Sequence, residues 1–330
     1  MSRRSSEHDA DNDRAFVQAC YEELLGRPAD EAGLAHYVEA LAGGMRRETL
    51  AAIFRASDEY IEREKRLSPA SSRIPRDVQL CELANPAKWN NPEWLAILKA
   101  LQAAPIDQAS MHRKAYELTQ TIFGLRRLGR LTESTSILSV GAGHEPILYY
   151  LANHARRVIA TDLYEGAWQA EFSREGSPDV LHDPATYAPF PYRRDRLTFL
   201  KMDGSRLGFR DGCFDVVYSL SSIEHFGGAE GARRSVADMA RVLKPGGILA
   251  LATEWCVRGR AGGEVFSPDQ VRHIIDHPSL RLVQPIDDRV WDRYETDPVD
   301  LRVDRFQTPH MLLKHDEAIF TSVFVFLEKT

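Results

Sequence analysis

The segment that most constrains the fold is Ile137-Leu-Ser-Val-Gly-Ala-Gly-His-Glu145, which is followed by Val158-Ile-Ala-Thr-Asp162. The pattern predicts a buried strand, a glycine turn, a helix, and a second buried strand that ends on a carboxylate. Glycines let a backbone approach a ligand closely, and a carboxylate at this position can accept hydrogen bonds from both hydroxyls of a ribose. The two segments therefore predict half of a nucleotide-binding unit, although a glycine turn alone also occurs as a plain link between a strand and a helix.

Three later segments continue the alternation of buried strands and polar turns. Residues 199–204 predict a strand that ends on Asp203-Gly204, and residues 214–222 predict a hydrophobic strand that opens into serines. Residues 241–251 combine a helix end, a Pro-Gly-Gly turn and a further strand. In this order and spacing, the chain from Met111 to Thr330 resembles the class I S-adenosylmethionine-dependent methyltransferases, and its run at 241–247 is typical of their small-molecule branch.

This resemblance implies an α/β fold with a doubly wound, Rossmann-like sheet of seven strands and helices on both faces. Residues 280–283 and 320–327 are the expected sixth and seventh strands, and the last strand is expected to be antiparallel. The implied cofactor is S-adenosyl-L-methionine.

The chain ahead of this domain divides into three parts. Residues 1–12 are polar, and we expect a disordered tail. Residues 13–67 show helical apolar spacing interrupted by glycine, which predicts a small all-α interaction module. Its segment 21–34 resembles an uncharacterised bacterial helical domain that is distantly similar to phycobilisome linker domains. Residues 68–110 are expected to be a linker and connector helices, and residues 111–330 the class I methyltransferase domain.

The composition of the chain argues against several classes of binding partner. The net charge of −6 provides no positive field for nucleic acid, and an Asn/Asp-Pro-Pro-Tyr type motif is absent after the fourth predicted strand. No apolar run approaches the length of a membrane span. The four cysteines are scattered, and His, Cys and carboxylate residues lack metal-ligand spacing, so neither a disulfide framework nor a metal site is predicted. We therefore expect a cytoplasmic protein without a bound metal.

The resemblance also assigns residues to each part of the cofactor. The turn Gly141-Ala142-Gly143 is expected to pass the methionyl end and the ribose. Asp162 is expected to bind the ribose hydroxyls and Leu163 to lie against the adenine. Three further residues complete the expected pocket: Asp203 accepting from the adenine amino group, Gly204 beside it, and Ser219 at the methionine end. Alternative interpretations are a helix cap for Asp162, a tight turn for Asp203 and a buried strand-end serine for Ser219.

Two positions depart from the family pattern. Ser139 stands where an acidic residue often binds the methionine ammonium, and Glu145 replaces the third glycine of the turn. Glu145 either takes over that ammonium or favours the N-terminus of the following helix. The basic cluster of His112 and Lys114 either neutralises the methionine carboxylate, binds an anionic substrate group, or forms a solvated helix end.

Histidines near the expected site are candidate catalytic residues. His225 follows the fourth predicted strand, and imidazole is suited to accept a proton near neutral pH. The alternative is that Glu224-His225 only shapes the pocket, as it does in relatives of differing chemistry, and that catalysis is mostly proximity and orientation. His144, beside the glycine turn, is the second candidate. Aromatic residues in the connections at the carboxyl edge of the sheet are expected to line an acceptor pocket, or else to pack the loops: Trp168, Phe172, Tyr187, Phe190, Tyr192, Trp255, Trp291 and Tyr294.

Three hypotheses for function remain. The leading one is transfer of a methyl group to an oxygen or nitrogen of a small-molecule or glycan-like acceptor. The second is a catalytically degenerate methyltransferase-fold scaffold that the helical module recruits to a protein partner or to a second copy. The third is a nicotinamide-dependent oxidoreductase that uses the same glycine turn.

Overall fold

The computed structural model describes residues 12–55, 57–60, 63, 74–102, 106–107, 110–164, 177–290, 298–304 and 308–330. Residues 1–11 of the predicted tail and residues 68–73 of the predicted linker lie outside these ranges.

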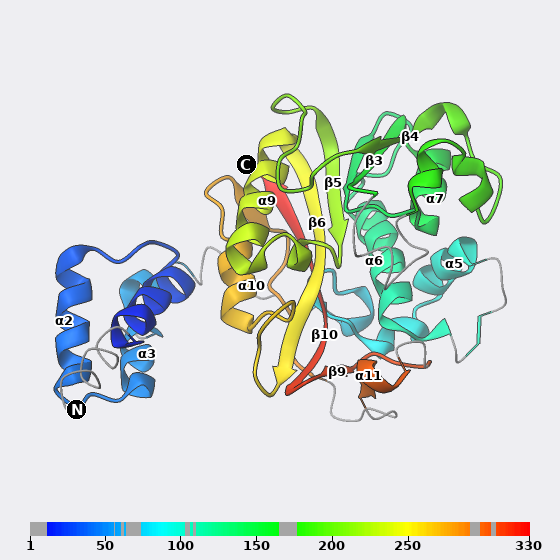
Figure 1. Ribbon diagram of the computed structural model, residues 1–330. Helices are drawn as coiled ribbons and strands as arrows, with labels where there is room; N and C mark the ends of the chain where they lie inside the picture. Colours follow the sequence, from blue (N-terminus) through cyan, green and yellow to red (C-terminus); the bar gives the residue numbers. More distant parts are fainter. Residues whose placement is uncertain are drawn as a thin grey trace.

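A mixed β-sheet forms the centre of the molecule (Figure 1), and its main strands follow the order β4-β3-β2-β5-β6-β10. The first five of these are parallel, and β10 runs antiparallel to β6. The predicted α/β fold and the antiparallel last strand are therefore confirmed. The strands are β2 (Ser136–Val140), β3 (Arg157–Asp162), β4 (Leu197–Lys201), β5 (Phe214–Leu220), β6 (Leu243–Arg258) and β10 (Ala318–Lys329).

The described residues contain ten strands in this sheet, so the predicted number of seven is wrong. Strands β6 and β10 are long, and β10 offers backbone pairing to short segments that carry no clear strand pattern. The expected sixth strand at residues 280–283 is confirmed as β7 (Leu280–Leu282), which pairs with β10. Of the three additional strands, β1 and β9 pair with β10, and β8 pairs with β9. They are β1 (Glu82–Leu83), β8 (Val299–Asp300) and β9 (Leu313–His315).

Helices cover both faces of the sheet, as Figure 1 shows. α5, α6 and α7 pack together on one side, and α9 and α10 on the other. Each turns an apolar face to the sheet, as a helix on a buried sheet must. The helices are α5 (Pro92–Leu101), α6 (Arg113–Arg127), α7 (Pro146–His154), α9 (Gly228–Val242), α10 (Pro268–Ile275) and the short α11 (Leu301–Asp304).

The connection from β3 to β4 contains only short 3-10 turns in its described part. These are η5 (Pro178–Leu181), η6 (Pro184–Tyr187) and η7 (Arg194–Arg196). After β5, the turn η8 (Ile223–His225) leads directly into α9. Within the described chain, no helix combines the length and the apolar character needed to cross a membrane.

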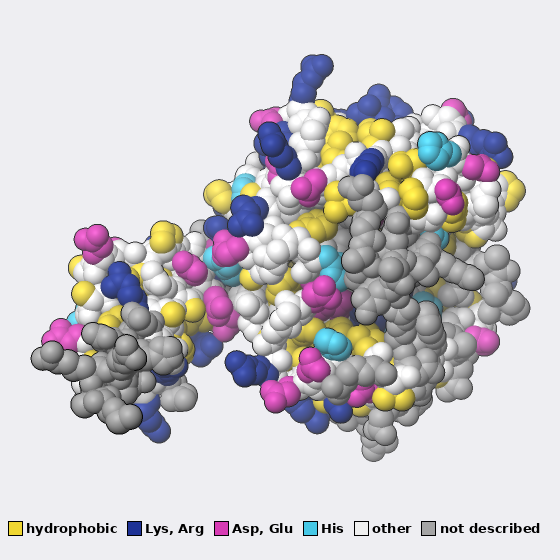
Figure 2. Space-filling view, viewed as in Figure 1, with side chains coloured by type: hydrophobic (Ala, Val, Ile, Leu, Met, Phe, Trp, Pro, Cys, Tyr) yellow, Lys and Arg dark blue, Asp and Glu magenta, His cyan; other side chains and the backbone are white. Residues whose placement is uncertain are grey.

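The N-terminal residues form a helical lobe beside the sheet (Figure 1), and in the space-filling view this lobe projects from the side of the larger body (Figure 2). Residues 12–20 are helical and run into η1 (Tyr21–Leu25), and α2 (Glu31–Ala42) and α3 (Arg47–Arg55) follow. The lobe has its own apolar cluster, which includes Val17, Leu34 and Leu50. Asp30 accepts a hydrogen bond from the Gly33 amide at 2.8 Å, which is a helix cap.

The connector between this lobe and the sheet domain carries η2 (Arg76–Val78) and η3 (Pro86–Asn90). It packs on α6 through buried polar contacts. Lys88 Nζ lies 2.9 Å from Glu82 Oε1, and Tyr116 donates to the same carboxylate at 2.9 Å. The Tyr116 hydroxyl therefore joins α6 to a buried ion pair within the connector.

Candidate active site

A cavity of about 290 Å³ opens where β2, β3 and β5 end. The strand order reverses between β2 and β5, and ligands of open α/β sheets bind outside the carboxyl ends of the strands at such a point. The lining residues are Lys114, Gly141, Gly143, Glu145, Asp162, Leu163, Met202, Gly204, Leu220, Ser221, Ser222, His225, Phe226 and Glu264.

The glycine turn forms one wall of the cavity. Gly141 and Gly143 have φ angles of 69° and 48°, a region that glycine occupies without strain. A Cβ on Gly141 would lie 2.4 Å from the Cβ of Ser222, so packing against the neighbouring turn also requires glycine there. Ala142 is buried and does not line the cavity.

Asp162 joins the end of β3 to the glycine turn. Its Oδ2 accepts a hydrogen bond from the Gly143 amide at 2.9 Å, and its Oδ1 accepts from the Tyr164 amide at 3.4 Å. The Tyr164 hydroxyl donates to the Gly143 carbonyl at 3.0 Å. The adjacent Leu163 lines the cavity with 47% of its surface exposed, and it is one of four exposed large apolar side chains among the described residues.

Of the three residues predicted to bind the cofactor at the ends of β4 and β5, one lines the cavity and two do not. Gly204 lines the cavity, and its added Cβ would lie 2.6 Å from the ring of Phe226. Asp203 is exposed and accepts from the Ser205 amide at 2.8 Å, as in a turn, and only its neighbours on either side line the cavity. Ser219 is buried inside β5, away from the cavity lining, and its Oγ has no hydrogen-bond partner in the described part of the chain.

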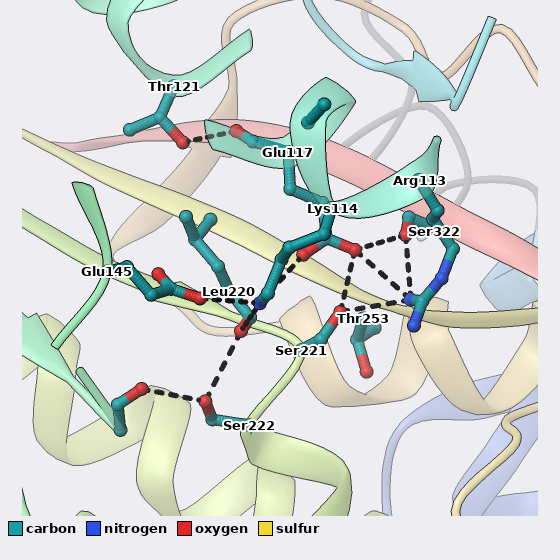
Figure 3. A network of polar contacts seen from close by, with 12 residues as sticks. Arg113, Lys114, Glu117, Thr121, Glu145, Leu220, Ser221, Ser222, Thr253 and Ser322 are labelled. Carbon is teal, nitrogen blue, oxygen red and sulfur yellow. Dashed lines mark hydrogen bonds and ion pairs between the residues drawn. The ribbon is translucent and has the colours of Figure 1, made fainter. Parts of the chain in front are cut away.

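Of the predicted basic cluster, Lys114 reaches the cavity (Figure 3). Its Nζ lies 2.8 Å from Glu145 Oε1, 3.2 Å from Glu117 Oε2 and 3.1 Å from the Leu220 carbonyl. Glu145 caps no backbone amide of α7 with its side chain. Lys114 and Glu145, which were both predicted to bind the cofactor, therefore form an ion pair at one end of the cavity.

His112 lies elsewhere. It is the N-cap of α6, where its Nδ1 accepts from the Ala115 amide at 3.2 Å, and its ring packs 5.8 Å from that of His310. Burial, and then the neighbouring His310, lower the pKa of His112 to about 4. The residue is therefore neutral near pH 7 and structural in its contacts.

Of the two candidate catalytic histidines, only one lines the cavity. His225 lines the cavity, and its Nδ1 lies 2.7 Å from Oε1 of Glu264, which lines it as well. Glu264 belongs to the turn after β6, and its neighbours Val265 and Phe266 are buried and anchor that turn. His144 does not line the cavity, and its ring packs 4.5 Å from that of Tyr187.

The predicted aromatic lining is not among the residues at the cavity. Tyr187, Phe190, Tyr192 and Trp255 are described, and they pack on other parts of the protein. Trp168, Phe172, Trp291 and Tyr294 lie outside the described residues. Phe226 is the aromatic residue at the cavity in the part that is described.

Sequence reasoning missed several lining residues, chiefly Met202, Ser222 and Glu264. Met202 and Ser222 lie near the ends of the predicted segments 199–204 and 214–222, and that position was a usable signal. Glu264 is 39 residues from its partner His225, and no motif marks it. Among the described residues, no group of three or more His, Cys, Asp or Glu side chains could hold a metal ion.

Comparison with known proteins shows what the region around this cavity is similar to. Residues 138–251 match the profile of a family described as "Methyltransferase domain". This part of the chain is therefore similar to methyltransferase domains. Residues 3–63 match a domain of unknown function, DUF4214, which agrees with the predicted resemblance to an uncharacterised domain. The distant similarity to phycobilisome linkers stays a prediction.

Individual proteins match over parts of their length. A demethylmenaquinone methyltransferase of Corynebacterium glutamicum (strain R) is 30% identical over 168 residues, which cover 46% of this chain and 61% of that protein. The chain thus spans about three fifths of the length of the curated relatives it matches.

Two solved structures are among those that match this chain. YcgJ protein from Bacillus subtilis is 14% identical, with 62% of this chain and 97% of that chain covered and a TM-score of 0.42. The N-methyltransferase NodS from Bradyrhizobium japonicum is 14% identical, with 62% and 92% covered and a TM-score of 0.38.

Proposed function

We propose that this chain is an S-adenosylmethionine-dependent methyltransferase that acts on an oxygen or nitrogen of a small-molecule or glycan-like acceptor. The observation that carries this proposal is the cavity at the strand ends, where the glycine turn and Asp162 meet inside the matched methyltransferase domain.

The residues around the cavity fit the parts of the cofactor. Asp162 offers carboxylate oxygens for a ribose diol, and the exposed Leu163 with Met202 offers apolar surface for an adenine. Lys114 and Glu145 carry the opposite charges that a zwitterionic amino-acid end requires, and Glu145 replaces the acidic group absent at Ser139. When bound, the cofactor supplies a methyl group activated by a sulfonium.

Proton removal from the acceptor falls to His225 in this proposal. The Glu264 carboxylate 2.7 Å from Nδ1 favours the tautomer that carries its proton on Nδ1. Nε2 then holds the lone pair that accepts the proton of an acceptor hydroxyl. His144 is the weaker candidate, because its ring packs on Tyr187 outside the cavity lining.

Titration calorimetry with S-adenosylmethionine tests the proposal. We expect saturable binding by the wild type and at least about tenfold weaker binding by Asp162→Ala, because hydrogen bonds to a charged group contribute about 1.5–3 kcal/mol. Asp195→Ala, at an exposed aspartate in η7, is the control and should bind like the wild type. Absence of binding by the wild type, or equal binding by Asp162→Ala, would refute the proposal. Thermal melting of the variant separates lost binding from lost folding.

For the N-terminal lobe we propose a docking or self-association role. In the structure it contacts α10 through Arg63, which lies 2.8 Å from Asp276, and through Arg55, which lies 2.9 Å from Asp269. Deletion of residues 1–66 should leave a folded protein that binds S-adenosylmethionine, and the change in mass by light scattering should show whether the lobe mediates association. Insoluble protein after the deletion would contradict an independent catalytic domain.

A further inference from the structure

A buried ionic cluster lies directly behind the cavity wall at Lys114 (Figure 3). Its centre is the Glu117 carboxylate on α6, which is fully buried. Oε1 of Glu117 accepts from Ser221 Oγ at 2.8 Å, from Arg113 Nη1 at 3.1 Å, and from Ser322 Oγ. Its Oε2 accepts from Lys114 Nζ at 3.2 Å. One carboxylate therefore receives donors from α6, from β10 and from the turn after β5.

Glu117 is held in its charged form. Burial acts to raise the pKa of this carboxyl, but the adjacent Lys114 and Arg113 and the two serine hydroxyls outweigh burial, so its pKa lies below its usual value. Arg113 is balanced separately by Glu254, which it contacts at 2.7 Å. Glu117 thus retains a full negative charge to set against the Lys114 ammonium.

The contacts of Lys114 come from three different elements. Glu117 Oε2 and the Leu220 carbonyl hold its ammonium from the protein interior and from the end of β5. Glu145 contacts the ammonium from the opposite side and belongs to the cavity lining. A ligand with both an ammonium and a carboxylate can enter between Lys114 and Glu145 and replace one ion pair by two. Glu117 and Leu220 stay in place during that exchange and fix the position of the cation.

We propose that Glu117 is a positioning residue for the amino-acid end of the S-adenosyl ligand, acting through Lys114. This inference rests on the proposed function. It places part of the binding machinery on α6, outside the residues that match the methyltransferase domain family. Glu117 itself touches neither ligand nor acceptor, because it is fully buried behind Lys114.

Two ligands that differ only at the amino-acid end test this role. S-adenosylhomocysteine and 5′-methylthioadenosine share adenine, ribose and a thioether sulfur, but the second has a methyl group in place of the amino-acid chain. By calorimetry, Glu117→Gln and Lys114→Met should each bind S-adenosylhomocysteine about tenfold more weakly, and 5′-methylthioadenosine within about twofold of the wild type. Glu93→Gln, at an exposed glutamate that pairs with Arg127 at the other end of α6, is the control and should leave both affinities unchanged.

A double-mutant cycle asks whether Glu117 acts through Lys114. If it does, the variant with both substitutions binds S-adenosylhomocysteine no more weakly than Lys114→Met alone. Three results would overturn the inference. Glu117→Gln could weaken the binding of both ligands equally, or it could leave the binding of S-adenosylhomocysteine unchanged. In the third case, the loss of affinity in the double variant would equal the product of the two single losses. If Glu117→Gln fails to fold, Glu117→Asp is measured against the same criteria. A wild type that binds neither ligand would instead refute the proposed function.

Discussion

Replacement of Lys88 by methionine removes the cation from the buried ion pair of the connector, to which Tyr116 of α6 donates a hydrogen bond. The side chains of Lys88 and Glu82 are 0% and 1% exposed, and their nearest atoms are 2.9 Å apart. Methionine retains most of the volume of the lysine stem, so the change is chiefly one of charge. It leaves the Glu82 carboxylate buried, with hydrogen bonds from Tyr116 at 2.9 Å and Asn85 at 3.4 Å but without a cation.

We expect Lys88→Met to lower the free energy of unfolding by about 3–5 kcal/mol, the usual cost of breaking a buried pair. The deficit should also depend on pH. Burial raises the pKa of Glu82 from 4.5 to about 7, although Lys88 opposes the shift. Because the folded state binds this proton more tightly than the unfolded state, stability from this group is complete below about pH 4.5 and declines as pH rises through 7. Loss of Lys88 raises the pKa further and deepens that decline by about 1.4 kcal/mol for each unit.

Urea denaturation of wild type and variant at pH 5 and pH 8 measures both effects. The deficit should be larger at pH 8. Lys99→Met, at an exposed position on α5, is the matched control and should stay within about 0.5 kcal/mol of the wild type. Adding Glu82→Gln to Lys88→Met should recover part of the loss at pH 8, and the stability of this double variant should no longer contain the pH dependence that Glu82 contributes. A deficit below about 1 kcal/mol, or one equal at both pH values, would refute this reasoning.

Two further predictions concern the cavity. In Glu264→Gln, nitrogen NMR of histidine-labelled protein should show that His225 loses its preference for the tautomer protonated on Nδ1. The control Glu230→Gln removes a carboxylate from His273 and should leave the His225 signal unchanged. An unchanged tautomer ratio of His225 in Glu264→Gln would contradict the role assigned to Glu264. Gly204→Ala should lower the free energy of unfolding by about 1–3 kcal/mol and weaken the binding of S-adenosylmethionine, because the new Cβ would lie 2.6 Å from the ring of Phe226. Gly208→Ala, whose Cβ has its nearest neighbour at 3.7 Å, is the control, and equal behaviour of the two alanine variants would count against the packing argument.

The part of the site that follows from local pattern was predictable from the sequence. Buried strands are marked by runs of apolar residues, and positive φ angles call for glycine, so both features are visible in short segments. This is why β2, β3 and the turn at Gly141 were identified, together with Asp162 at the strand end beside it. Lys114 was also identified, from its place just ahead of a helix, although its partner there was left open.

Other features depended on segments that meet only in the folded chain. The extra strands β1 and β9 exist because β10 extends far enough to pair with short segments of unremarkable sequence, and β8 pairs in turn with β9. Asp203 matched a motif, yet its side chain is occupied by a local turn at the rim. In such cases backbone pairing and side-chain direction decide the role of a residue, and a linear pattern records neither.

The sequence by itself determined that this chain forms an α/β sheet with a glycine turn and a carboxylate at the ends of two adjacent strands. Only the tertiary structure decided which distant side chains complete the site. Glu264 reaches His225 across 39 residues, and Glu117 meets Ser221 across 104. Such pairings follow from the register of the sheet and the packing of α6, which bring together charges that have no relation along the chain.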